Sequence, residues 1–165
     1  MKRVIALSDS HGDAEGLREC YQMAKRSGAV DIAVFLGDGA DDFEKVRPEW
    51  EAQGTVCYAV SGNNDWRSDN PQEISFRVGK VVFYACHGHT RYVKYGFERL
   101  WFAAREREAQ VALYGHTHRA DIEIEYGLYM INPGAVCERR PKAAAFAEIF
   151  VEDNGGIMPG IVRWD

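Results

Sequence analysis

The sequence has no apolar run longer than about six residues, far short of the roughly 20 that a membrane-spanning helix needs. Its first eight residues are partly apolar but turn polar at Asp9 without a cleavage motif, so we interpret them as a core strand and not as a secretion signal. We therefore expect a cytoplasmic protein with no membrane partner.

The sequence also lacks the features of three other classes of protein. The four cysteines form no C-x-x-C pair, which argues against a zinc knuckle or a redox pair and favours buried thiols in a reducing compartment. Neither a Walker loop nor a G-x-G-x-x-G motif is present, so nothing indicates an ATPase or a nicotinamide enzyme. The net charge of −5 argues against nucleic-acid binding, which needs a basic face. A phosphorylated substrate stays compatible with this charge, because bound metals supply positive charge locally.

The 165 residues have the length of one domain, which we expect to span residues 1–165. In the first half, apolar periodicity predicts strands at residues 3–7, 31–36 and 55–60 and a helix at residues 14–27. A further short helix carries Phe43, Val46 and Trp50 and is disturbed by Pro48. Alternating strands and helices are typical of a parallel sheet with crossover helices.

The second half is richer in hairpins. Paired strands are predicted at residues 74–78 with 80–85, 120–126 with 128–132, and 145–152 with 156–163. A helix carries Phe97, Leu100, Trp101 and Ala104, and a short strand covers residues 111–114. We therefore expect an α/β protein with a mixed sheet or two packed sheets.

All five histidines lie in short loop motifs that also carry glycine or aspartate. With two further loops the set is Asp9-Ser10-His11, Gly37-Asp38, Gly62-Asn63-Asn64-Asp65, His87-Gly88-His89 and Gly115-His116-Thr117-His118. Each motif follows the carboxyl end of a predicted strand, where open α/β sheets bind their ligands. The glycines at 12, 37, 62, 88 and 115 permit the tight turns that such loops need.

Carboxylate, amide and imidazole donors together suit a divalent transition metal. Taken singly, each motif is an ordinary turn or helix cap, and only His116 and His118, which share a face if extended, are suggestive alone. Five such motifs at five strand ends predict a common metal centre.

The ordered motifs, from Asp9 to His118, resemble those of the calcineurin-like metallophosphoesterases. The segment Ile131-Asn132-Pro133-Gly134-Ala135 is similar to one in the small YfcE-type phosphodiesterase branch. The resemblance implies a four-layer α/β/β/α sandwich in which two mixed sheets are flanked by helices. It also implies two metal sites, the first formed by Asp9, His11, Asp38 and His118 and the second by Asp38, Asn63, His87 and His116.

Asp38 would bridge the two cations and screen their repulsion. Such a pair lowers the pKa of a bridging water, and the resulting hydroxide attacks a phosphoester in line with the leaving oxygen. The mixed ligands suit manganese, which we expect, with iron, zinc, cobalt and nickel as alternatives. The expected partner is a small phosphoester, most simply a phosphodiester, and a homo-oligomer fits this branch.

Position 64 departs from the family pattern. Many members have G-N-H-D, whose histidine helps protonate the leaving group, whereas this chain has Asn64. His89 is the substitute acid, or it supports the site only by hydrogen bonding. Asp65 is expected to orient the Asn63 loop and not to bind metal.

Other residues are weaker candidates. Substrate phosphate could meet Arg91, Arg119 or the run Arg139-Arg140-Pro141-Lys142, but an ordinary solvated face is the favoured interpretation of each. A ring could stack on Trp66, Tyr92 or Tyr95, whereas Phe97 and Trp101 have helical spacing and favour core packing. The alternative functions are a phosphomonoesterase, a catalytically weak binding scaffold of the same fold, and a nuclease. A protein-directed phosphomonoesterase is disfavoured because the chain lacks the arginine of the G-D-x-V-D-R-G motif. A nuclease is disfavoured because the chain lacks a basic face.

Overall fold

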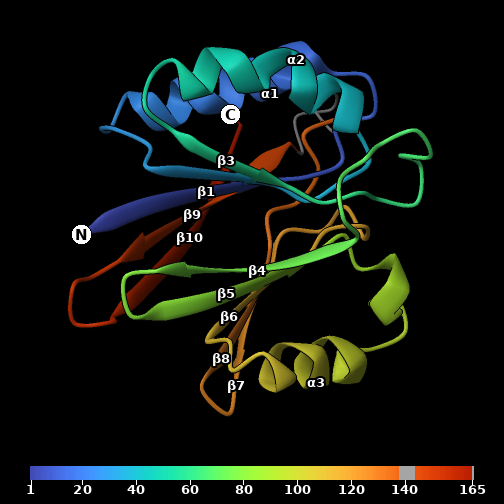
Figure 1. Cartoon of the computed structure of the whole chain (residues 1–165), viewed down its shortest axis with the longest axis vertical. Helices are drawn as coiled ribbons and strands as arrows, with labels where there is room; N and C mark the ends of the chain where they lie inside the picture. The colour runs from blue at the N-terminus through green and yellow to red at the C-terminus, as the bar shows by residue number, and fades with distance from the viewer. Residues whose placement is uncertain (138–143, 165) are drawn as a thin grey trace.

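The computed structural model describes residues 1–137 and 144–164. Two five-stranded sheets lie face to face, with helices on both outer sides (Figure 1). The first sheet has the order β10-β9-β1-β2-β3, with bounds Ile157–Arg163, Ala145–Val151, Lys2–Leu7, Ile32–Phe35 and Val56–Ala59. The second has the order β4-β5-β6-β8-β7, with bounds Glu73–Val78, Val81–Cys86, Val111–Leu113, Leu128–Asn132 and Asp121–Glu125.

Three apolar clusters hold these layers together. One fills the space between the sheets and includes Val4, Phe83 and Ile149. Another joins the first sheet to the helices α1 (Ala14–Lys25) and α2 (Ala40–Glu51), and the last joins the second sheet to α3 (Glu98–Glu106). The predicted four-layer α/β/β/α sandwich is thereby confirmed.

Both sheets mix parallel and antiparallel strands. The pairs β1–β2, β2–β3, β5–β6 and β6–β8 are parallel, whereas the three predicted hairpins are antiparallel, and β9 runs antiparallel to β1. Parallel strands end at one edge, so the loops after β1, β2, β5 and β6 meet there. None of the helices that the structure describes is long and apolar enough to cross a bilayer.

One helix differs from its prediction. The helix α2 continues through Pro48, although proline lacks the N–H that would bond to the carbonyl of Glu44. The buried face of Phe43, Val46 and Trp50 packs on the first sheet, and this packing outweighs the lost bond.

Candidate metal centre

The loops after β1 and β2 are joined through their backbones. The N–H of Asp9 donates to the carbonyl of Gly37 at 2.9 Å, and the N–H of His11 donates to that of Asp38 at 3.0 Å. Asp9 and Asp38 are both buried, and His87 Nε2 lies within 3.9 Å of a carboxylate oxygen of each. Buried carboxylates need compensating partners, and these are His11 and histidines from the second sheet.

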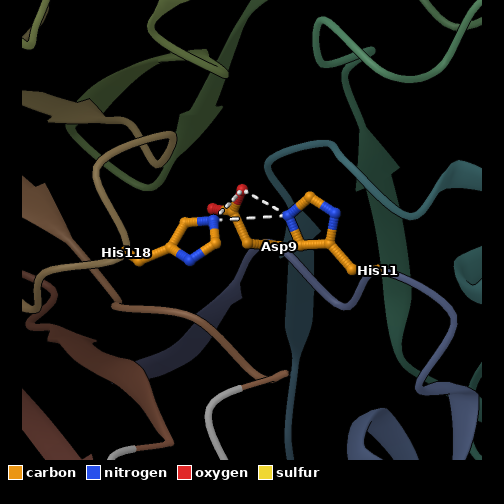
Figure 2. Close-up of side chains that lie close together, drawn as sticks. All are labelled: Asp9, His11 and His118. Atoms are coloured by element: carbon orange, nitrogen blue, oxygen red, sulfur yellow. Dashed lines mark hydrogen bonds and ion pairs between the residues drawn. The ribbon is translucent and has the colours of Figure 1, made fainter.

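Asp9, His11 and His118 form a first group of convergent donors. The two Nε2 atoms of the imidazoles are 3.3 Å apart, and Asp9 Oδ1 lies 3.5 Å from that of His11 and 3.3 Å from that of His118. Figure 2 shows the two rings on either side of the Asp9 carboxylate. Although Asp9 is fully buried, its Oδ1 atom has no hydrogen-bond partner within residues 1–137 and 144–164.

Asp38, His87 and His116 form a second group beside the first. His87 Nε2 lies 3.2 Å from His116 Nδ1 and 3.4 Å from Asp38 Oδ2. The other ring nitrogen of His87 donates to the carbonyl of Leu36 at 2.7 Å, which leaves the Nε2 lone pair facing the group. The groups are adjacent, because His11 Nε2 is 3.8 Å from Asp38 Oδ2 and His87 Nε2 is 3.9 Å from Asp9 Oδ1.

These separations fit metal ligands. Two donors on one tetrahedral ion, with bonds near 2.1 Å, lie about 3.4 Å apart. The three spacings of the first group are 3.3 to 3.5 Å, and His87 in the second group lies 3.2 Å and 3.4 Å from its two neighbours. Asp9 Oδ1 has no hydrogen-bond donor among the described residues. Both groups are therefore geometrically and chemically suited to a divalent cation.

The charges of the two groups perturb one another. Burial alone would raise the pKa of Asp9, but its contacts with His11 and His118 hold that pKa well below the usual range. Burial would also raise the pKa of Asp38, but its contacts with His87 and Asn64 outweigh this effect and lower the pKa to about 2. His87 has a raised pKa because its contact with Asp38 overcomes burial, whereas burial and the charge of His87 lower the pKa of His116 to about 4.

The loop after β3 holds the second carboxylate. Asp65 accepts hydrogen bonds from the N–H groups of Asp38, Gly39, Ala40 and Gly62, at 2.7 to 3.0 Å. Asp65 thereby ties the loop after β3 to the loop after β2, and its orienting role at the site stays a prediction. The carbonyl of Asn63 accepts from Trp66 Nε1, but no contact between the Asn63 side chain and either donor group is recorded within the described ranges.

His89 begins the 3₁₀ turn η1 (His89–Arg91) beside the second group. Its ring centroid lies 5.5 Å from that of His87 and 6.2 Å from that of His116. Burial, together with the charge of His87, lowers its pKa. The Nδ1 atom of His89 is buried and has no partner in the described part of the chain. The ring thus lies at the metal centre with one nitrogen uncommitted.

The loop glycines serve two purposes. Gly37 and Gly88 have φ angles of +99° and +119°, which side-chain-bearing residues rarely adopt. At Gly62 the reason is space, since a Cβ there would lie 2.2 Å from Asp38 Oδ1. At Gly115 a Cβ would lie 2.1 Å from Ser8 Oγ and 2.9 Å from Asp9 Oδ2. The motif glycines therefore let neighbouring loops approach the carboxylates closely.

Several supporting residues were not predicted as such. Ser8 donates to Asp9 at 2.6 Å, and buried Asp42 accepts from Ser10 Oγ and from the N–H of Gly12. Asn132 joins the carbonyl of Gly115 to the hydroxyl of Thr117. Asp42 lies in the first turn of α2, where an acidic residue is ordinary, so only its burial reveals its role.

The weaker candidates separate clearly. Arg91 binds Glu73 and Tyr84, away from the two groups, and Arg119 is exposed. Trp66, Tyr92 and Tyr95 are exposed, whereas Phe97 and Trp101 pack on the core of the second sheet, as predicted. The run Arg139-Arg140-Pro141-Lys142 lies outside the described residues.

Known proteins share this sequence and fold. The chain is 34% identical over 157 residues to the probable metallophosphoesterase YsnB of Bacillus subtilis, covering 94% of this chain and 88% of that protein. It is 28% identical to phosphodiesterase MJ0936 of Methanocaldococcus jannaschii over 149 residues, 82% of this chain and 84% of that protein. The crystal structure of a predicted phosphoesterase from Streptococcus pneumoniae superposes with a TM-score of 0.74 at 24% identity, covering 98% and 97% of the two chains. Residues 1–154 match the calcineurin-like phosphoesterase superfamily domain, and the chain belongs to that superfamily.

Proposed function

We propose that this protein is a metal-dependent phosphodiesterase that hydrolyses small phosphodiesters. The observation that carries the proposal is the pair of adjacent donor groups, in each of which the ligand atoms lie within 4.8 Å of one another. A site with two neighbouring cations suits in-line displacement at phosphorus. The names of the relatives YsnB and MJ0936 support the same class of reaction.

The first ion would be held by Asp9, His11 and His118, and the second by His87, His116 and Asn63, with Asp38 shared between them. Manganese is our first choice, with iron, zinc, cobalt and nickel as alternatives, since availability decides among metals for such ligands. When bound, the ions supply Lewis acidity for the phosphoryl oxygens and lower the pKa of a water molecule.

Burial differs across the site and defines the side from which substrate approaches. Asp9, Asp38 and His87 are buried, whereas the side chains of His11 and His118 are each about one-third exposed. The phosphate group therefore enters over His11 and His118. His89, whose Nδ1 atom is buried without a partner in the described ranges, is our candidate for contact with the leaving oxygen.

A diester is favoured over a monoester by charge. Within residues 1–137 and 144–164, the ion-pair partners of Asp9 and Asp38 are all histidines, and no arginine or lysine is paired in this cluster. A monoester carries more negative charge than a diester, and enzymes that bind it usually provide a cationic clamp. Among the described residues, no arginine or lysine is paired with the two carboxylates to form such a clamp.

The test is turnover by metal-reconstituted protein. We expect a higher kcat/KM on bis(p-nitrophenyl) phosphate than on p-nitrophenyl phosphate with each metal that supports activity. A monoester rate that dominates across metals and pH would favour a phosphomonoesterase. Metal binding without turnover on either ester would favour a binding scaffold. The cytoplasmic location and a homo-oligomeric state stay predictions.

A further inference from the structure

A cavity of about 730 Å³ opens beside the metal centre, between the loop that follows η1 and the loop that follows β6. Thr117, which lines it, stands between the proposed ligands His116 and His118. Val93, on the opposite wall, packs so closely on Gly88 that a Cβ there would lie 2.8 Å from Val93 Cγ2. Both walls are thus fixed to loops that carry the histidine cluster, and the volume is in the usual range for small-molecule sites.

The floor of the cavity is aromatic. The rings of Phe97 and Tyr114 lie 5.4 Å apart at an angle of 60°, and Tyr114 is only 2% exposed. Phe97 is only partly buried, so its ring is the one that a further ring can contact, and its packing on Tyr114 holds it in place. This floor suits an aromatic group better than a flexible chain.

The rim of the cavity carries an excess of positive charge. Lys94 and Arg119 are both exposed, and neither forms an ion pair with any residue that the structure describes. One carboxylate, Asp121, also lines the cavity and leaves a net charge of about +1 there. The neighbouring groove differs, because its Arg91 is paired with Glu73 and its Arg99 lies over the Tyr92 ring at 4.3 Å.

We infer that this cavity binds the retained substituent of a phosphodiester, and that it selects an aromatic substituent bearing a carboxylate or phosphate. The inference rests on the proposed function for the position of phosphorus. A substituent reaching from the metal centre past Thr117 would place its ring on Phe97, which packs on Tyr114. Its anionic group would then meet Lys94 and Arg119, the two cations without a partner among the described residues.

The test uses diesters that share p-nitrophenolate as the leaving group. The retained substituent is phenyl, 4-carboxyphenyl, 4-trimethylammoniophenyl or 4-carboxybutyl. We expect kcat/KM to be about tenfold higher for 4-carboxyphenyl than for 4-trimethylammoniophenyl, mainly through KM, because two exposed ion pairs are gained. The 4-carboxybutyl ester should be about fivefold poorer than the 4-carboxyphenyl ester, because it has no ring to stack.

Paired variants locate the effect. Lys94→Gln with Arg119→Gln should reduce the tenfold ratio to about one. The control, Arg77→Gln with Lys80→Gln, makes the same change of charge at two exposed residues of the β4–β5 hairpin and should leave the ratio unchanged. Equal ratios in all three proteins, or a wild-type ratio near one, would overturn the inference.

Equilibrium dissociation constants of the same esters separate this inference from the proposed function. If no diester is hydrolysed, the proposed function fails, yet the subsite still predicts about tenfold tighter binding of the 4-carboxyphenyl ester than of the 4-trimethylammoniophenyl ester. If instead the phenyl diester is hydrolysed but the 4-carboxyphenyl and 4-trimethylammoniophenyl esters react and bind equally well, the proposed function stands and the subsite is wrong.

Discussion

Asn64 holds the Asp38 carboxylate with two hydrogen bonds, one from its backbone N–H at 2.9 Å and one from its side-chain amide at 2.8 Å. At the position where the family pattern implied by the resemblance has a histidine, this chain therefore has a residue that positions the proposed bridging ligand. An amide does not transfer protons as an imidazole does, so wild-type protein should be fast on aryl leaving groups and slow on alkoxide or ribose leaving groups.

The variant Asn64→His tests this directly. We expect it to raise the ratio of alkyl-diester to aryl-diester rates by at least about tenfold, because an alkoxide needs a proton on departure. Asn64→Ala is the matched control, since it removes the same amide without adding an acid and should slow both substrate classes by one factor. Identical ratios for both variants would show that position 64 has no access to the leaving oxygen.

His89→Ala should act on the same ratio in the opposite direction. If His89 contacts the leaving oxygen, alkyl diesters should slow by roughly 10²-fold, whereas esters of p-nitrophenol should change little. The measurement is kcat at saturating substrate, with metal content determined for each preparation. A uniform loss on both classes, with lower metal content, would instead assign His89 a supporting role through His87.

The close approach of the loops predicts a contrast between two glycines. Gly62→Ala should destabilise the protein by about 1–3 kcal/mol and weaken metal binding, because the new Cβ would collide with the Asp38 carboxylate and backbone N–H. Gly160→Ala, in β10, adds a Cβ with no atom within 4 Å and should change stability by about 0.5 kcal/mol or less. Thermal unfolding and metal titration of both variants measure this, and equal effects would contradict it.

The pKa shifts predict how metal binding responds to pH. His11 and His87 have raised pKa values, so in metal-free protein their stabilising charge is complete below the unfolded pKa of about 6.5 and is lost as pH rises through the folded value. Metal requires the same nitrogens to be deprotonated. The gap in Tm between metal-loaded and metal-free protein should therefore widen from pH 6 to pH 8, and a gap independent of pH would count against these two histidines as ligands.

Apolar periodicity was sufficient to predict the strands and the convergence of the motifs, because parallel strands end at one edge, whereas the four-layer arrangement was implied by the family resemblance. The sequence was not sufficient to predict backbone strain. Asp9, His11, Asp38, His116 and His118 all have φ between +43° and +71°, a left-handed conformation that costs about 1–3 kcal/mol at each such residue. Hydrogen bonds between loops that are distant in the sequence impose that conformation, and local sequence patterns do not predict such bonds.

Two other features depend on contacts across the fold. Pro48 predicts a disturbed helix, yet the packing of α2 on the first sheet keeps it continuous. Asp42 looks like an ordinary acidic residue at a helix start, and only its burial against Ser10 shows that it supports the first loop. Sequence spacing thus indicates which loops come together. Which side chains bond to one another within the cluster depends on contacts that form only when the layers pack.

The most direct test of the metal centre is a crystal structure of metal-reconstituted protein with anomalous scattering at the absorption edge of the metal. Our account predicts two anomalous peaks, one bound by Asp9, His11 and His118 and the other by His87, His116 and Asn63, with Asp38 between them. Ligand bonds should be near 2.0–2.2 Å. A single peak elsewhere on the surface, or none with these side chains unmoved, would contradict it.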